Sequence, residues 1–339
     1  MKPGKLPHDL LAAMLARLPQ DDPRVIVGPR VGEDAAAVDM GDRLLVAAMD
    51  PITFATDLIG WYAAHVNAND LAVMGATPRW FLATILLPES AAEQDVVSIS
   101  DQMAGCCKDL GITIIGGHTE TTTEVRRPIV IGCMLGEARR DRLFTSSGAR
   151  PGDVLVLAGS IAVEGTALLA RDAGELLQAR GIGARAVAQA RDLLFQPGIS
   201  VVRAARVGAC TPGVSAMHDP TEGGLATGLR ELAIASGVGL EIAADEIPTL
   251  PYTQDFCTAL GLNPLGLIAS GSLVITVRPK RVEELLAALR SASVEASTIG
   301  RVLPEADGLW LRDEEKRGPL PEFFRDEVAR FLGEQAGGC

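Results

Sequence analysis

Two spacings of hydrophobic residues recur along the first half of the chain, and together they predict a mixed α/β domain. Short apolar runs between turns are typical of buried strands, whereas apolar residues repeated every three or four positions are typical of a helix. The predicted strands lie at 25–27, 44–49, 80–87, 112–115 and 129–137, and the predicted helices lie at 57–76 and 91–110. This order is not a regular series of β-α-β units, so we do not expect a purely parallel sheet.

A turn-rich segment at residues 146–153 marks the predicted domain boundary, because an apolar strand at 154–158 follows it. A chain of 339 residues is long for a single core, so two domains are expected. Beyond the boundary, helical spacing covers 164–195, 225–235, 252–260, 280–292 and 322–334, and strand patterns cover 239–243, 271–278 and 297–312. We therefore predict an N-terminal domain over 1–150, a C-terminal α/β domain over 151–334 and a flexible tail over 335–339.

The charge balance narrows the classes of ligand. The formal net charge is −12 and the sequence pI is about 4.9. An acidic protein repels nucleic-acid backbones, so no nucleic-acid partner is expected, whereas a nucleotide is compatible because Mg²⁺ can bridge carboxylates to phosphates. No apolar run approaches the roughly 20 residues of a membrane span, so no membrane association is expected either, and no signal peptide is recognisable.

The cysteines favour a reducing compartment. Six are present, with no Cys-x-x-Cys pair and no Cys/His spacing of a zinc site. All except Cys339 lie in apolar or helical stretches, which is typical of buried thiols. We therefore predict free thiols and a cytoplasmic location.

A loop reading Met-His-Asp-Pro-Thr-Glu-Gly-Gly-Leu carries the strongest indication of chemistry. Pro220 disfavours a continuous helix, and Thr221 is a suitable cap for the helix that follows. Gly223 and Gly224 let another backbone approach closely. Asp219 then stands beside a helix N-terminus, where N–H groups suit phosphate and a carboxylate suits Mg²⁺. The alternative interpretation is a capped turn without a ligand.

Four further segments place a carboxylate next to small residues. They are Gly-Glu-Asp-Ala-Ala at 32–36, Asp50 at the end of a predicted strand, Asn-Ala-Asn-Asp at 67–70, and Gly-Gly-His-Thr-Glu at 116–120. Any one of them alone favours a cap or a turn. Together with Asp219 they predict a distributed site for Mg²⁺ and phosphate. The sequence has no P-loop, no Gly-x-Ser-x-Gly elbow and no dinucleotide fingerprint between a strand and a helix.

The ordered set of segments resembles the superfamily of aminoimidazole ribonucleotide synthetase, selenophosphate synthetase, thiamine-monophosphate kinase and the hydrogenase maturation factors called HypE. The stretch Asn-Asp-Leu-Ala-Val-Met-Gly-Ala at 69–76 and the loop at 217–224 are most similar to the HypE branch. The match covers nearly the whole chain. It implies an N-terminal α/β domain whose strands form a barrel shared across a homodimer, a C-terminal α/β domain, and ATP with Mg²⁺ bound between the domains.

Site residues are carried over from the resemblance position by position. The implied metal ligands are Asp34, Asp50, Asp70, Glu120 and Asp219, and the implied nucleotide-binding residues are Asp34, Asn69, Gly116, Gly117, Thr119, Thr221, Gly223 and Gly224. His118 departs from the HypE pattern, which has Asp there, and is similar to selenophosphate synthetase at this position. A neutral imidazole is a poor Mg²⁺ ligand, so Glu120 is expected to supply the oxygen, and His118 is kept as a catalytic candidate.

Cys339, the last residue of the printed sequence, is the second catalytic candidate. HypE proteins end in Pro-Arg-Ile-Cys, and their terminal thiol carries a carbamoyl group that is dehydrated with ATP to a thiocyanate. The last four residues here are Ala-Gly-Gly-Cys, which form a flexible arm but lack the Pro-Arg-Ile. A tail without function is the alternative.

These observations predict a cytoplasmic, homodimeric enzyme that uses ATP and Mg²⁺ and acts like HypE. The resemblance implies a carbamoyltransferase and other hydrogenase maturation proteins as partners. Two alternatives stay open. One is a small-molecule kinase or synthetase of the thiamine-monophosphate kinase or aminoimidazole ribonucleotide synthetase kind, and the other is a non-catalytic nucleotide-binding homologue.

Overall fold

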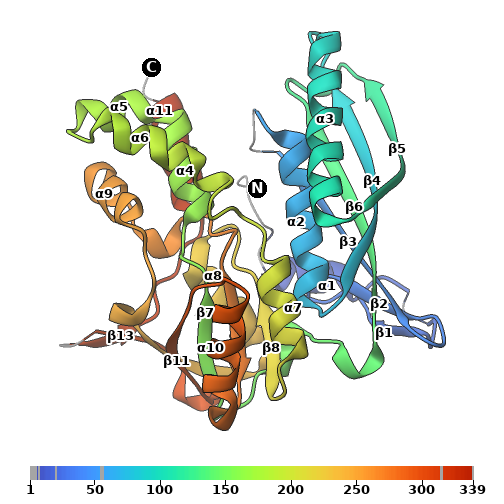
Figure 1. Ribbon diagram of the computed structural model, residues 1–339, viewed down its shortest axis with the longest axis vertical. Helices are drawn as coiled ribbons and strands as arrows, with labels where there is room; N and C mark the ends of the chain where they lie inside the picture. The colour runs from blue at the N-terminus through green and yellow to red at the C-terminus, as the bar shows by residue number, and fades with distance from the viewer. Residues whose placement is uncertain (1–5, 7, 20, 54–56, 314–315, 338–339) are drawn as a thin grey trace. The chain divides into compact units, whose positions relative to one another are not determined.

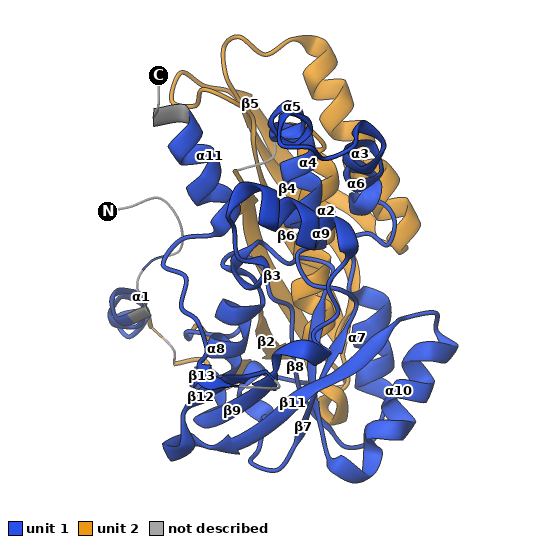
Figure 2. Ribbon diagram, turned by 90° about the vertical axis from the view of Figure 1, so that its left-hand side faces the viewer, with its two compact units in different colours: residues 1–18, 30–33, 144–339 blue, residues 19–29, 34–143 orange. Residues whose placement is uncertain are grey.

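The computed structural model describes residues 6, 8–19, 21–53, 57–313 and 316–337. Of residues 336 and 337 it describes only the backbone. Figure 1 shows the order of the helices and strands, and Figure 2 colours the two compact units of the chain. Unit 2 consists of Pro19–Pro29 and Asp34–Leu143, and unit 1 consists of Met1–Leu18, Arg30–Glu33 and Phe144–Cys339. The predicted division at residue 150 stays a prediction about independently folding domains.

Unit 2 is built on a six-stranded sheet in the order β1-β2-β3-β6-β4-β5. Its strands are β1 (Val25–Val27), β2 (Ala36–Asp39), β3 (Leu44–Ile52), β4 (Thr77–Leu87), β5 (Thr113–Thr121) and β6 (Ile129–Ala138). Neighbouring strands are antiparallel except β4 and β5, which pair in parallel. The sheet is therefore mixed, and the α/β class predicted from the sequence is confirmed.

Two helices of unit 2, α2 (Ile59–Val73) and α3 (Glu93–Leu110), lie on one side of this sheet (Figure 1). Gly60 lets α2 approach α3 closely, because a Cβ there would collide with the carbonyl oxygen of Ile99. α3 ends at Gly111, whose φ of 70° closes the helix in the left-handed conformation that glycine tolerates. Alternate residues of β3, β4 and β6 are buried against α2, and they form the core of the unit.

The other face of the sheet carries neither α2 nor α3, and it is mostly apolar along β3 and β6. Met49 of β3 projects from this face and is 64% exposed, and its neighbours Leu45 and Ala47 are half-buried. β5 is the last strand, so its outer edge pairs with no other strand in the described part of unit 2. An uncovered apolar face beside an open strand edge is typical of a surface that another chain covers.

Unit 1 contains a seven-stranded sheet in the order β13-β12-β9-β11-β7-β10-β8. Its strands are β7 (Val154–Ala158), β8 (Val214–His218), β9 (Val238–Ala243), β10 (Leu273–Val277), β11 (Ala296–Pro304), β12 (Leu309–Arg312) and β13 (Arg317–Pro319). β12 and β9 pair in parallel, and the other neighbours are antiparallel. β10 is buried along its whole length, so the core of unit 1 lies at the β7-β10-β8 side of the sheet.

The α-helices of unit 1 include two groups whose members contact one another. They are α1 (His8–Leu15), α4 (Val163–Asp172), α5 (Gly174–Ala179), α6 (Ala184–Arg191), α7 (Val202–Cys210), α8 (Gly224–Ser236), α9 (Pro251–Leu260), α10 (Val282–Ser291) and α11 (Glu327–Gly337). α7 and α10 contact each other and the strands, whereas α4 contacts α5, α6, α9 and α11 (Figure 1). Within the described ranges, no helix has the length and apolar character needed to cross a membrane.

Two strands differ from the prediction in a way that bears on the site. β5 continues to Thr121, so the 116–120 segment is part of a strand, whereas the sequence analysis placed it in the loop after a strand that ended at residue 115. β3 continues to Ile52, so Asp50 lies inside the strand and not beyond its end. In both cases strand pairing with a neighbour extends the element past the apolar run that predicted it.

Candidate functional site

Asp50 is held in place by a buried asparagine of α2. The Oδ1 atom of Asn67 accepts a hydrogen bond from the Asp50 amide at 2.9 Å, and its Nδ2 donates to the carbonyl oxygens of Ala63 at 2.9 Å and Asp50 at 3.4 Å. Gly132 of β6 leaves room for this side chain, because a Cβ there would collide with Asn67. Asn67 is 0% exposed and satisfied at both ends, so it fixes β3 to α2 at a predicted metal ligand.

Replacing Asn67 with alanine is expected to destabilise the protein by about 2–4 kcal/mol, because the change removes three hydrogen bonds, two of them to the part-buried backbone of Asp50. Urea unfolding followed by circular dichroism measures the loss. Gln94→Ala, on the exposed surface of α3, is the matched amide control and should leave stability nearly unchanged. Equal unfolding midpoints for Asn67→Ala and the wild type would show that this anchor contributes nothing.

The sheet register places Asp50 in one row with the glycines of β5. Asp50 pairs with Gly132, Gly132 pairs with Ala83, and Ala83 pairs with Gly117. Three strand spacings separate the ends of this row by roughly 14 Å. A Cβ on Gly117 would collide with the Ala83 carbonyl oxygen, so only glycine fits there. Thr119, two residues beyond Gly117, projects from the same side of the sheet as Asp50.

His118 and Glu120 project from the opposite side of the sheet, because side chains alternate along a strand. The Nε2 atom of His118 lies 3.1 Å from Oε2 of Glu120, and both side chains are exposed. The structure therefore brings these two residues together and separates them from Asp50. The metal role of Glu120 and the catalytic role of His118 stay predictions, and both would act from the side that carries Met49.

Three other predicted site residues of unit 2 are Asn69, Asp70 and Asp34. Asn69 and Asp70 are both buried on α2, although polar side chains are costly in such a position unless they are bonded. Asp34 lies two residues ahead of Ala36, which pairs with Ala47 of β3. Asp34 is thus at the same end of the β2–β3 pair as Asp50.

In unit 1, a buried network holds the residue that precedes Asp219. The Nε2 atom of His218 lies 3.1 Å from Oε2 of Glu231 on α8, and its Nδ1 lies 3.4 Å from Oγ of Ser146. A neutral imidazole that carries its proton on Nε2 satisfies both contacts, by donating to the carboxylate and accepting from the hydroxyl. Asp219 is itself only 4% exposed, so it extends from a fixed point at the end of β8.

The 32–36 segment reaches the same network through Glu33. The amide of Ser146 donates to Oε2 of Glu33 at 3.3 Å. Gly32, with a φ of 84°, packs against α8, where a Cβ would lie 3.1 Å from the Cβ of Ala235. Residues 32–33 and the loop at 217–224 are thus joined within unit 1. Ser146, the residue that joins them, lies in the turn-rich segment that the sequence predicts as the domain boundary.

The paired glycines begin α8, and this corrects the prediction that Thr221 caps the helix. Gly223, with a φ of 79°, is the N-cap, and no side chain caps the helix there. Two successive left-handed residues, Gly223 and Gly224, move the start of the helix beyond Thr221. The Thr221 hydroxyl is therefore not at the N-cap position, from which it could accept a bond from the first helical amides. The amide of Gly223 donates instead to Oδ2 of Asp326 at 2.9 Å. The nucleotide role of Thr221 stays a prediction.

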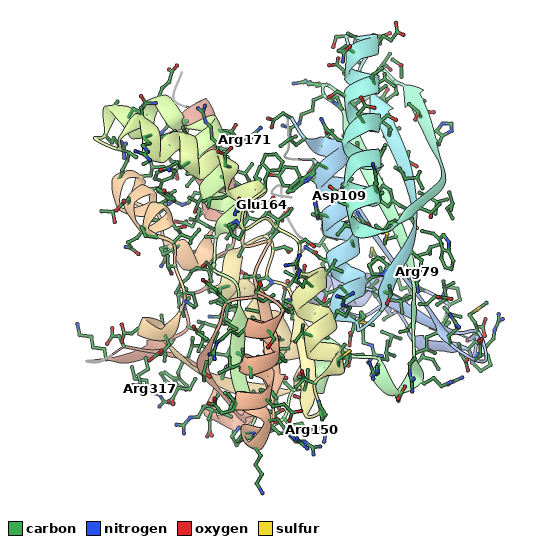
Figure 3. The ribbon with its side chains drawn as sticks, in the orientation of Figure 1. Arg79, Asp109, Arg150, Glu164, Arg171 and Arg317 are labelled. Atoms are coloured by element: carbon green, nitrogen blue, oxygen red, sulfur yellow. The ribbon has the colours of Figure 1, made fainter. Side chains whose placement is uncertain are left out.

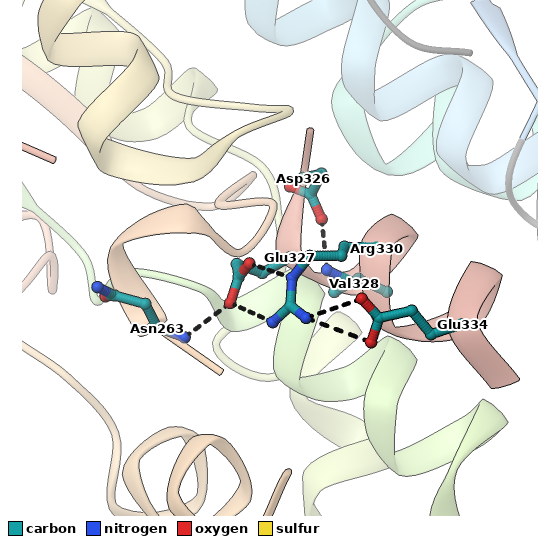
Figure 4. A network of polar contacts seen from close by, with 6 residues as sticks. All are labelled: Asn263, Asp326, Glu327, Val328, Arg330 and Glu334. Carbon is teal, nitrogen blue, oxygen red and sulfur yellow. Dashed lines mark hydrogen bonds and ion pairs between the residues drawn. The ribbon is translucent and has the colours of Figure 1, made fainter. Parts of the chain in front are cut away.

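Ion pairs and hydrogen bonds anchor the start of α11 beside this loop (Figure 4). The Oδ1 atom of Asp326 accepts from the amide of Val328 at 2.8 Å, and Oε2 of Glu327 accepts from the amide of Asn263 at 3.0 Å. Arg330 pairs with Oε1 of Glu327 at 2.7 Å. The N-terminal end of α11 is therefore fixed to the rest of unit 1.

The C-terminal end of α11 extends into the predicted tail. The sequence analysis ended the last helix at residue 334, whereas α11 continues to Gly337. Gln and Ala at positions 335–336 are good helix formers, which accounts for the extra turn. Cys339 lies outside the described residues.

Comparison with known proteins identifies this architecture. The model of the N-terminal domain of AIR synthase related proteins matches residues 32–138, and the model of their C-terminal domain matches residues 150–309. A relative from Cupriavidus necator named carbamoyl dehydratase HypE is 32% identical over 286 residues, which cover 81% of this chain and 78% of that protein. This chain belongs to the AIR synthase related family, among the relatives of HypE.

Solved HypE structures share the fold. Escherichia coli HypE aligns with a TM-score of 0.73 and 25% identity over 95% of this chain and 98% of that one. A HypE in complex with ATP aligns with a TM-score of 0.67 and 23% identity over 91% and 92% of the two chains. A HypE in complex with HypF aligns with a TM-score of 0.69 and 21% identity over 85% and 93%.

The acids of this AIR synthase related chain suit Mg²⁺ by their chemistry. Among the described residues, no three His, Cys, Asp or Glu side chains form a group that could hold a metal ion by themselves. Mg²⁺ commonly takes only one or two carboxylates and completes its shell with water and phosphate oxygens, so such a group is not required. Asp34 and Asp50, at one end of the β2–β3 pair, and Asp219, after β8, each carry hard carboxylate oxygens of the kind that this ion prefers, and their metal role stays a prediction.

Four polar residues near the loop were missed by sequence reasoning. They are Ser146, Glu164, Glu231 and Asp326. Glu164 and Glu231 each stand in a helical stretch of mostly small or apolar residues, and a lone carboxylate of that kind was the one available signal. Ser146 and Asp326 sit in turn-like sequence that gives no sign of burial.

Proposed function

We propose that this chain is an ATP- and Mg²⁺-dependent enzyme of hydrogenase maturation, which dehydrates a carbamoyl group carried on the thiol of Cys339. The observation that carries the proposal is the 32% identity over 81% of the chain to a relative named carbamoyl dehydratase HypE. All five carboxylate segments lie inside the two matched family domains. A HypE structure with bound ATP supports ATP as the co-substrate.

The proposed reaction requires the carbamoyl oxygen to attack the γ-phosphorus of ATP, against the negative charge of the triphosphate. Mg²⁺, when bound, would neutralise that charge. Asp34, Asp50 and Asp219 would hold the ion, and the N-terminus of α8 at Gly224 would favour a phosphate group. Asn67 would position Asp50 through the contacts that fix β3, and His218 would position Asp219 through the contacts that fix the end of β8.

We further propose a carbamoyltransferase as the partner that loads the thiol, in a cytoplasm that keeps the cysteines reduced. A HypE solved in complex with a second protein, HypF, supports a partner of this kind.

The proposal is tested by ATP turnover of the full chain after brief treatment with cyanate, which places carbamoyl groups on exposed thiols. ADP release with Mg²⁺ is expected from the carbamoylated chain and not from the untreated chain. If turnover instead needs a small diffusible acceptor and does not depend on carbamoylation, the result would favour a kinase or synthetase. The absence of turnover despite ATP binding would favour the non-catalytic alternative.

We also propose a homodimer that covers the apolar face of the unit 2 sheet. The uncovered face around Met49 and the open edge of β5 support it. A wild-type dimer at micromolar concentration is expected in sedimentation velocity. Met49→Glu should shift the protein to monomer, because it buries a charge in that interface.

Met40→Glu is the matched control for the dimer. Met40 is also exposed, but it lies in the turn after β2, away from the sheet face, so this variant should remain dimeric. A monomeric wild type, or equal dissociation by the two substitutions, would rule out this interface.

A further inference from the structure

Glu164 is a buried carboxyl group outside all five segments. It lies in the first turn of α4 and is 5% exposed (Figure 3). Its carboxylate has a side-chain hydrogen bond with Ser270, whereas its buried Oε2 atom has no hydrogen-bond partner. An unpaired polar atom is unfavourable in the interior, so its presence there points to a group that is bound only during function.

Backbone contacts link Glu164 to the loop that follows β8. The amide of Gly165 donates to the carbonyl oxygen of Ile268 at 3.1 Å, which ties the start of α4 to the 268–270 segment. The amide of Ala269 donates to the carbonyl oxygen of Thr221 at 3.2 Å. Ser270, the partner of Glu164, is thus adjacent to a residue bonded directly to the loop.

Two more carboxylates, those of Asp326 and Glu222, act on the carboxyl group of Glu164. Asp326 binds the Gly223 amide of the same loop, and Glu222 is the neighbour of Gly223 in sequence. Burial, and then the charges of Asp326 and Glu222, raise the pKa of Glu164 to about 7. Burial also raises the pKa of Asp326, to about 6. Near neutral pH the Glu164 carboxyl group therefore exists in both protonation states.

A purely structural role does not require a carboxylate here. Glutamine has the same shape and could bond Ser270 without placing an ionisable group beside two acids. We propose that Glu164 is a catalytic residue, which accepts a proton from the nitrogen of the carbamoyl group after that group has been phosphorylated. This inference rests on the proposed function and deepens it by naming the base.

The step balances in atoms and charge. The carbamoyl oxygen first forms a bond to the γ-phosphorus, and the bond from this phosphorus to ADP breaks. The two N–H bonds of the carbamoyl group then break, and their electron pairs form the carbon–nitrogen triple bond. The carbon–oxygen bond breaks at the same stage, and its electron pair leaves with the phosphate. One proton passes to Glu164 and the other leaves on the phosphate, so the products are a thiocyanate, ADP and phosphate.

The test compares Glu164→Gln with the wild type, using the full chain carbamoylated with cyanate. Glu164→Gln is expected to bind Mg²⁺–ATP with wild-type affinity, but to form thiocyanate at least about 100-fold more slowly. Its thermal midpoint at pH 8 should be at or above that of the wild type, because the change removes a buried charge. Glu175→Gln, an exposed glutamate of α5, is the matched control and should keep full activity.

Glu164→Ala in formate separates catalysis from positioning. Formate can enter the space left by the side chain and take the proton, so partial recovery of thiocyanate formation is expected. No recovery in a folded variant that binds ATP would overturn the inference, as would a wild-type rate for Glu164→Gln. If the wild type itself forms no thiocyanate, the proposed function fails and the inference falls with it. If the wild type and Glu164→Gln are equally active, the function stands and the inference alone is rejected.

Discussion

Replacing Cys339 with alanine is expected to reduce carbamoyl-dependent ATP turnover to the background rate, while ATP binding stays unchanged. The proposed substrate group is carried on the sulfur of this residue, so alanine removes its point of attachment. The acids that would hold Mg²⁺–ATP lie elsewhere in the chain, on β3, ahead of β2 and after β8. ADP release after cyanate treatment measures turnover, and calorimetry measures binding.

The position of α11 adds a condition to this prediction. The helix has 11 residues and so spans roughly 16 Å, while the two residues beyond it reach about 7 Å when extended. Its first turn is fixed beside Gly223 by Asp326. If the thiol of Cys339 acts at that loop, we therefore expect α11 to unwind from its C-terminal end.

Cys210→Ala is the matched control for the thiol. Cys210 is exposed on α7, so cyanate can reach it, but no part of the proposed site involves it. This variant should turn over ATP like the wild type. Full turnover in Cys339→Ala would show that the substrate is a diffusible molecule and that Cys339 takes no part in the reaction.

Asp50→Asn and Asp219→Asn are each expected to weaken Mg²⁺–ATP binding by a factor of roughly ten or more, which is about 1.4 kcal/mol. Asparagine keeps the shape of the side chain but loses the anionic oxygen that Mg²⁺ prefers. The fold should survive at Asp50, because Asn67 bonds only the backbone of that residue. Isothermal titration calorimetry, with and without Mg²⁺, checks the prediction.

Asp42→Asn is the control for the acids. Asp42 is exposed in the turn between β2 and β3, so its replacement removes the same charge a few residues from Asp50. The affinity of the Asp42→Asn variant for Mg²⁺–ATP should match that of the wild type. Unchanged affinity in both Asp50→Asn and Asp219→Asn would show that these acids do not hold the nucleotide-bound metal.

The sequence predicted most elements of both sheets because their strands are continuous apolar runs. It missed β2, β8 and α7, in which small and polar residues interrupt the apolar positions. Their sequences are Ala-Ala-Val-Asp, Val-Ser-Ala-Met-His and Val-Arg-Ala-Ala-Arg-Val-Gly-Ala-Cys. It also ended the predicted strand of β5 too early. Two glycines interrupt the apolar pattern there, and pairing with β4 carries the strand through them.

The candidate site was likewise predictable where neighbouring residues in the sequence determine it, and not where distant parts of the chain do. Asp50, Asp70 and Asp219 could be named from their neighbours in sequence, because small residues and breaks in apolar runs surround them. The separation of His118 and Glu120 from Asp50 depends on strand alternation across four strands, which the sequence does not display. The burial of Glu164 depends on contacts with residues more than 50 positions away.

The central claim is that this chain removes water from a carbamoyl group on its own Cys339. Intact-protein mass spectrometry of the cyanate-treated chain, before and after addition of Mg²⁺–ATP, tests it most directly. The account predicts that the carbamoylated species loses the mass of one water, that the loss maps to the peptide containing Cys339, and that it requires ATP. A carbamoylated Cys339 whose mass does not change, in a protein shown to bind Mg²⁺–ATP, would contradict it.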